Sequence, residues 1–202
     1  MEQGEVVVPF HVPRDRVREG TEFRSTWLTA SLEALRANAL FERYLTLLPL
    51  KYHDPILRSV AGMWLPIEIG MAHYNACDAL GLTVPEQVAL GKFVFKRLER
   101  TIFSLAFHAA RGVGVTPWST LRILPAVLAR ELRGGACAVY KVGPKDAHIE
   151  IIGFPCCSIP YCRTALRGMA VGVCELVCAK AYAQEIRELS SDTSVGYRVA
   201  WA

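Results

Sequence analysis

The sequence lacks any long uninterrupted apolar run, although it is apolar as a whole. Hydrophobic residues make up 52% of the 202 residues, charged residues only 21%, and the mean hydropathy is +0.24. No stretch reaches the roughly 18 apolar residues that a membrane-spanning helix needs. We therefore expect no transmembrane segment, and the apolar excess must fill a large core, an oligomer interface or a pocket for an apolar ligand.

Signals for export and for disulfide bonding are also missing. The first ten residues, MEQGEVVVPF, have no basic stretch followed by an apolar core, so they do not resemble a signal peptide. The seven cysteines are odd in number and lack the spacing of a disulfide scaffold. We therefore expect a cytoplasmic protein whose thiols are reduced and mostly buried.

The chain has little excess charge of either sign. Its net charge is +4, and the basic residues near the start and around residues 92–100 alternate with acidic ones. A solvated surface explains this pattern better than a nucleic-acid footprint does, because such a footprint needs basic residues gathered on one face. We expect no nucleic-acid partner.

Motifs of established chemistry are scarce. There is no Gly-x-Ser-x-Gly elbow, no Ser/His/Asp set and no outstanding carboxylate pair, and GGACAVYKVGPK has neither Walker nor dinucleotide spacing. Cys156, Cys157 and Cys162 do not follow a standard zinc spacing. The residues therefore predict no metal site and no cofactor.

Helical periodicity is what the first two-thirds of the chain does contain. Apolar residues recur every three or four positions, and prolines and glycines separate the segments. Pro125 lies inside the last of them, where we expect it to kink or break the helix. The predicted helices cover residues 26–39, 41–48, 54–60, 66–80, 83–111 and 116–133.

The period changes from 3.6 to 2 after Gly134-Gly135. Residues 137–142 and 149–151 alternate around a Gly-Pro-Lys-Asp turn, and residues 181–189 and 195–201 are two further strands. Between them lies a helix over 161–178, in which Gly168 and Gly172 are four apart and predict close packing. We expect one α+β domain over 1–202, with a helical part at about 20–133 and a four-stranded antiparallel β-β-α-β-β part at about 134–202.

Four segments resemble an uncharacterised family of about this length with many paralogues in myxobacteria. They are Gly114–Trp118, Gly134–Pro155, Tyr161–Leu176 and Tyr197–Trp201. The β-β-α-β-β end also resembles the fold shared by vinyl-reductase-type sensor domains, haem–nitric-oxide-binding domains and TRAPP vesicle-tethering subunits. This resemblance implies a module that binds a small molecule or lipid and is commonly dimeric.

The resemblance does not extend to the haem motif. The haem-binding family holds the haem carboxylates with Tyr-x-Ser-x-Arg, and the nearest match here, Tyr161-Cys162-Arg163, has another spacing and no serine. The cysteine pattern of the vinyl-reductase type is also unmatched. Likeness of fold alone does not license a haem or metal centre.

Two histidines and three cysteines each allow a second interpretation. His73 and Cys77 lie four apart on one helical face, where they are either packed core residues or a ligand or catalytic pair. His108 falls on a polar stripe, which is solvated or an anion site, and either histidine could serve as an axial haem ligand. Cys157 and Cys162 stand at a helix start, where a thiol could become reactive.

We expect a cytoplasmic homodimer that associates through its helical block and binds an apolar small molecule or lipid in a hydrophobic pocket. The residues expected to line the pocket are Trp64, His73, Tyr74, Cys77 and Trp118. An enzyme of the isomerase or cyclase type, with His73 as the acid or base, is the alternative. A pure protein-interaction subunit is the third.

Overall fold

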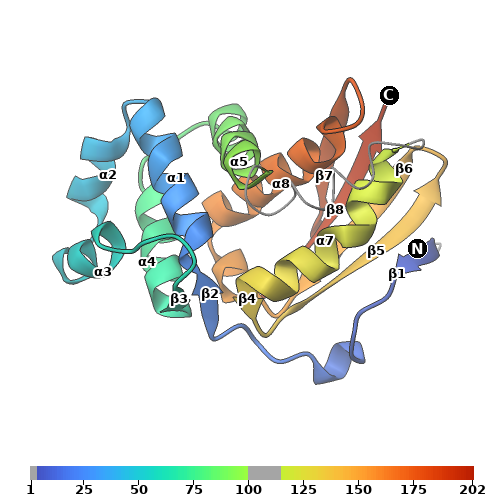
Figure 1. The fold of residues 1–202 in the computed structure, drawn as a ribbon, viewed down its shortest axis with the longest axis horizontal. Coiled ribbons are helices and arrows are strands. Elements are labelled where there is room, and N and C mark those ends of the chain that lie inside the picture. The colour runs from blue at the N-terminus through green and yellow to red at the C-terminus, as the bar shows by residue number, and fades with distance from the viewer. Residues whose placement is uncertain (1–3, 100–114) are drawn as a thin grey trace.

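The computed structural model describes residues 4–99 and 115–202. Helices gather in the first half, and a sheet forms the second (Figure 1). The helical block consists of α1 (Ser25–Ala37), α2 (Phe41–Leu47), α3 (His53–Leu57), α4 (Ile67–Asp78) and α5 (Val84–Leu98). The α+β class is thus confirmed, whereas the division into a single domain stays a prediction. The part of the 83–111 helix beyond residue 99 lies outside the described residues.

The main sheet is antiparallel and has five strands. Its order is β1 (Glu5–Val8), β5 (Ala136–Gly143), β6 (Asp146–Ile152), β8 (Ser194–Trp201) and β7 (Ala181–Ile186). The sequence predicted four strands for this sheet, and the fifth is β1, which adds to the free edge of β5 with Val6 opposite Tyr140. Helix α8 (Pro160–Glu175) connects β6 to β7 and packs on one face of the sheet.

A second, three-stranded sheet joins the two halves. Its order is β3 (Trp64–Pro66), β2 (Glu22–Arg24) and β4 (Leu132–Arg133). Two backbone bonds beside it fix the N-terminal segment: the Gly135 amide donates to Arg18, and the Gly20 amide donates to Gly153. The helical block therefore meets the main sheet at a hydrogen-bonded junction and not only through side chains.

Helix α7 (Pro117–Glu131) lies across the sheet on the same side as α8 (Figure 1). Thr116 caps its start and Pro117 occupies its first turn, as the Thr-Pro pair predicts. The helix continues through Pro125, so the predicted break at that proline does not occur.

Helices α5 and α8 approach so closely that only glycine fits at their crossing. A Cβ atom added to Gly91 would clash with the carbonyl group of Ala165, and one added to Gly168 would clash with that of Val88. Gly172 likewise faces the ring of Phe95. The predicted close-packing role of the glycines in α8 is confirmed, and their partner is α5.

One buried cluster runs from the helical block to the sheet. It includes Leu28 and Leu35 of α1, Tyr44 of α2, and Val139 and Val199 of the sheet, all of which are almost fully buried. Within residues 4–99 and 115–202, no helix combines the length and apolar character needed to cross a membrane.

Candidate apolar cavity

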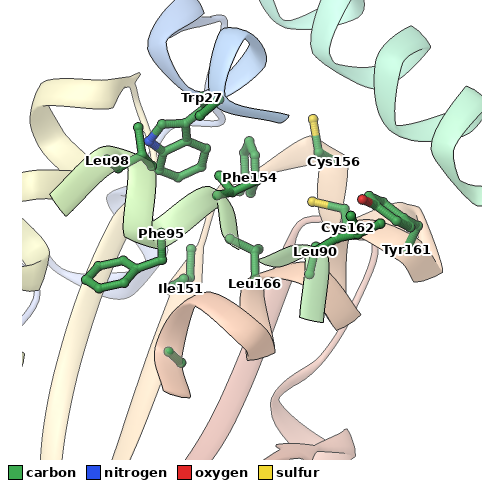
Figure 2. Packing of buried hydrophobic residues seen from close by; sticks show 14 of the residues in the cluster. Trp27, Leu90, Phe95, Leu98, Ile151, Phe154, Cys156, Tyr161, Cys162 and Leu166 are labelled. Atoms are coloured by element: carbon green, nitrogen blue, oxygen red, sulfur yellow. The ribbon is translucent and has the colours of Figure 1, made fainter. Parts of the chain in front are cut away.

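A cavity of about 50 Å³ lies where the helical block, α7 and α8 meet the main sheet. Seven elements contribute to its wall, namely α1, α5, α7, α8, β5, β6 and β8. Figure 2 labels five of the wall residues among the buried side chains that it draws, Trp27, Phe95, Leu98, Ile151 and Leu166. The other described wall residues are Leu124, Val127, Leu128, Cys137, Ile149, Met169, Ala170, Val173 and Tyr197.

The wall is almost entirely apolar. Tyr197 carries a hydroxyl, but that group donates to the carbonyl oxygen of Arg163 at 2.6 Å and is therefore already paired. Burial raises the pKa of the Cys137 thiol to about 12, so this side chain is neutral at physiological pH. Such a cavity suits an uncharged ligand whose binding is driven by the transfer of its apolar surface out of water.

None of the five residues expected to line a pocket contributes to this cavity. His73, Tyr74 and Cys77 lie together on α4 within the helical block, whereas Trp64 and Trp118 lie at two other places. The cavity residues could not be recognised from the sequence, because each one lies on an ordinary apolar face and only the tertiary fold brings them together.

His73 is a satisfied core residue. Its Nδ1 atom is 2.8 Å from the Tyr44 hydroxyl and its Nε2 atom 2.9 Å from the Ser31 hydroxyl. Burial lowers the pKa of His73 to about 3, so the ring is neutral. A histidine with both nitrogens occupied and no exposed surface has neither a free lone pair for a metal nor contact with a substrate.

Tyr74 and Cys77 complete this buried cluster. The Tyr74 ring packs against His73 with centroids 5.2 Å apart and against Tyr161 at 6.3 Å. Cys77 Sγ lies 3.7 Å from His73 Nε2, and burial raises the pKa of its thiol. The pairing of His73 with Cys77 on one helical face is therefore real, but the structure places the pair in the packed interior of the helical block.

The two tryptophans expected in a pocket have structural partners elsewhere. Trp64 lies between two guanidinium groups, with Arg24 4.3 Å and Arg133 4.4 Å from its ring centroid. Trp118 donates from Nε1 to the carbonyl oxygen of Pro144 at 3.0 Å and packs edge-on against Trp201. The first supports the three-stranded sheet, and the second anchors the start of α7 to the β5–β6 turn.

The candidate reactive thiols are buried, and their pKa values are raised, whereas a reactive thiol needs a lowered pKa. Burial raises the pKa of Cys157 to about 12 and that of Cys162 well above its usual value. The nearby Arg163 guanidinium opposes this rise without overcoming it. Neither thiol is exposed.

Metal ligands do not gather in the described part of the chain. No group of three or more histidine, cysteine, aspartate or glutamate side chains within residues 4–99 and 115–202 could hold a metal ion. His108, which the sequence left open as an anion-site residue or haem ligand, lies outside the described residues.

With this geometry in hand, known structures provide a comparison. The Fe(II) unliganded H-NOX protein from K. algicida aligns with a TM-score of 0.64 at 10% identity, over 89% of this chain and 96% of that one. The oxygen complex of an H-NOX domain related to soluble guanylate cyclases aligns with a TM-score of 0.57 at 11% identity, over 88% and 92%. A structure from work on haem distortion in the H-NOX family gives 0.56 at 11%, over 88% and 92%.

These alignments establish that the chain has the H-NOX fold. The expected resemblance to haem–nitric-oxide-binding domains is thus confirmed at the level of fold. No family model matches the sequence, and no curated protein matches it either. The likeness to the myxobacterial family, and to the vinyl-reductase-type and TRAPP proteins, stays a prediction.

The described residues do not fit a haem. The cavity of about 50 Å³ is far smaller than the roughly 300–1,000 Å³ of ordinary cofactor pockets. Backbone contact of α5 with α8 at Gly91 and Gly168 closes the space beside it. His73 has both nitrogens engaged, and Arg163, the nearest match to the haem-carboxylate arginine, pairs with Glu185 at 3.4 Å.

Proposed function

We propose that this chain is a small-molecule sensor module of the H-NOX fold whose ligand occupies the apolar cavity directly, without haem. The observation that carries the proposal is the position of the cavity. It lies between the helical block and the sheet, and its wall includes residues of α1 and α5 from the block and of β5, β6 and β8 from the sheet. A ligand there would contact both halves at once, so its binding energy would favour one arrangement of the two over others.

The size of the cavity limits the ligand to a few non-hydrogen atoms. An engineered apolar cavity of about 150 Å³ binds benzene or xenon, and the present one, at about 50 Å³, is smaller. A lipid chain would require α5 and α8 to separate at their glycine contacts. We therefore propose a small apolar molecule in place of a lipid.

Xenon under pressure tests this proposal, because it is apolar and needs no polar partner. We expect saturable shifts of the methyl resonances of Val127, Ile149 and Leu166, which line the cavity. The methyl groups of Leu50, which is 83% exposed, serve as the internal reference. Equal, non-saturating shifts at both places would contradict the proposal.

A cavity-filling variant provides the matched control. Ala170 is buried in α8 and contributes to the wall, so Ala170→Leu places three extra carbon atoms in the cavity. Overpacking costs about 1–3 kcal/mol, and the fold of the variant is checked by its thermal transition. We expect xenon to leave the methyl resonances of the folded variant unchanged.

We also propose that the molecule is a cytoplasmic homodimer that associates through its helical block. Among the described residues, eight large apolar side chains are exposed, and five of them lie between Leu47 and Met63. This stretch runs from the last residue of α2 through α3 to the residue before β3, at the end of the molecule away from the main sheet (Figure 1). Light scattering tests the dimer: Leu50→Asp should halve the mass, whereas Val6→Asp should not.

We do not propose an enzyme. The alternative of an isomerase or cyclase depended on His73 as an acid or base in contact with a substrate. The hydroxyl groups of Tyr44 and Ser31 occupy both nitrogens of that ring, and the side chain is 1% exposed.

A further inference from the structure

One buried polar group in the cavity wall has no partner among the described residues. It is the indole Nε1–H of Trp27, a wall residue that is only 7% exposed. Buried hydrogen-bond donors are almost always paired, and an unpaired one costs about 1–3 kcal/mol. The indole Nε1–H of Trp118, in contrast, donates to the carbonyl oxygen of Pro144.

The unpaired nitrogen lies next to another residue of the cavity wall. Figure 2 shows it on the edge of Trp27 that faces Leu98, another wall residue, and away from Phe154. Phe154 packs edge-on against the indole with centroids 6.0 Å apart and holds its orientation. Trp27 therefore presents one fixed donor to an otherwise apolar space.

A water molecule is a poor occupant of this position. A buried water typically makes about three hydrogen bonds, and the polar groups needed for them are missing. The Tyr197 hydroxyl donates to the carbonyl oxygen of Arg163, and the side chains of the other described wall residues, apart from Trp27, contain only carbon and sulfur. A water would thus gain one strong bond and lose the rest.

From these observations we infer that the ligand of this cavity is a small, uncharged molecule with an apolar body and one hydrogen-bond acceptor, which receives the Trp27 Nε1–H. The inference rests on the proposed function, because it names the chemistry of that same site. The apolar wall binds the body of the ligand, and the indole selects molecules with an acceptor and sets their orientation. A cation or an anion is excluded because nothing in the described wall compensates its charge.

Two gases of similar shape test separately whether the cavity binds an apolar body and whether Trp27 selects a hydrogen-bond acceptor. Dimethyl ether and propane each have three non-hydrogen atoms in a chain, but only the ether has an acceptor. We expect both to shift the cavity methyl resonances, and only the ether to move the Trp27 indole proton resonance downfield. The sequence has four tryptophans, so the spectrum holds four indole signals, and Trp27→Phe identifies the one that belongs to Trp27.

Affinities measured on the wild type and on Trp27→Phe complete the test. The ratio of the ether and propane dissociation constants contains the different hydration of the two gases, but this contribution is the same for both proteins and cancels when their ratios are compared. We expect this ratio to favour the ether by about threefold to tenfold more in the wild type than in the variant, the effect of one hydrogen bond.

Each outcome has one meaning. If propane and xenon bind but the ratio and the indole signal do not change, the acceptor inference is overturned and the proposed function survives. If no gas shifts the cavity methyl groups, the proposed function itself fails. If Trp27→Phe does not fold, the Trp27 indole signal is assigned in the wild-type protein by its through-space contact with the Phe154 ring, and its response to the ether and to propane decides alone.

Discussion

Burial sets the protonation of single residues in this molecule, and it does so in opposite directions for a base and an acid. His73 has a pKa lowered to about 3, whereas Glu131 has a pKa raised to about 7. In both cases burial disfavours the charged form. The two residues should therefore give the stability of the protein opposite dependences on pH.

His73 should make the protein less stable as the pH falls from about 6.5 toward 3. In this range the unfolded chain binds a proton at His73 and the folded protein does not, so acid favours unfolding. The slope from this one group approaches about 1.4 kcal/mol per pH unit. Urea unfolding between pH 4 and pH 6 should show a shallower dependence in His73→Asn. An equal change in His11→Asn, at an exposed position, would contradict this reasoning.

Glu131 should make the protein less stable as the pH rises from about 4.5 to about 7. Here the unfolded chain releases its proton first, while burial keeps the folded carboxyl protonated against the opposing effects of Arg24 and Arg130. Its Oε2 atom has no hydrogen-bond partner among the described residues. At pH 8 we expect Glu131→Gln to raise the free energy of unfolding by about 1–3 kcal/mol.

The control for Glu131 is an exposed acid. Glu68→Gln, on the solvent side of α4, should change the free energy of unfolding little at any pH. A gain at pH 8 that persists unchanged at pH 4.5 would show that the effect of Glu131→Gln does not come from its ionisation.

For single residues, the sequence could predict the surroundings only where residues nearby in the chain determine those surroundings. The spacing of Gly168 and Gly172 predicted close packing, and α5 does pack there. The pairing of His73 with Cys77 also followed from helical geometry. The unpaired Trp27 donor could not be predicted, because its partners would have come from α5, α7 and the sheet.

Among the elements, the crossing of α5 and α8 is the most sensitive to substitution. Gly91→Ala would gain up to about 1 kcal/mol in helix propensity, but its Cβ meets the Ala165 backbone, which cannot move aside. We expect a net loss of about 1–3 kcal/mol in chemical denaturation. Gly70→Ala is the matched control, because the Cβ there meets only the ring of Phe23, and its loss should be smaller.

Whether a helix or strand could be predicted from the sequence depended on its length. Strands β5, β6, β7 and β8 have six to eight residues, enough for an alternating pattern to appear. Strands β2, β3 and β4 have three, three and two residues, so no period could reveal them. The sequence left open whether Pro125 kinks or breaks its helix, and α7 is not broken there because its packing on the sheet and α8 outweighs the local cost of proline.

At the scale of the molecule, an ion pair between Arg14 and Glu150 ties the N-terminal segment to the main sheet. Glu150 on β6 is buried, and the Arg14 guanidinium, which is half exposed, contacts its carboxylate. Arg14→Ala should leave this buried charge without a partner and cost about 1–3 kcal/mol, less than a fully buried pair because water reaches the arginine. The double variant Arg14→Ala/Glu150→Gln should recover most of the loss in thermal unfolding. If it does not, the pair is not the cause.

The three-stranded sheet has a consequence for the order in which the protein folds. Arg133 and Glu22, which pair across β4 and β2, are 111 residues apart in the chain. Closing so long a loop is entropically costly, and contacts of this kind form late. The helical block and the β5–β8 sheet can each gain local structure first, but the cavity exists only after this last seam has closed. Binding of a gas in the cavity should therefore begin only when the final docking step is complete. Measured during refolding, it would report the end of folding, which helix content alone would not.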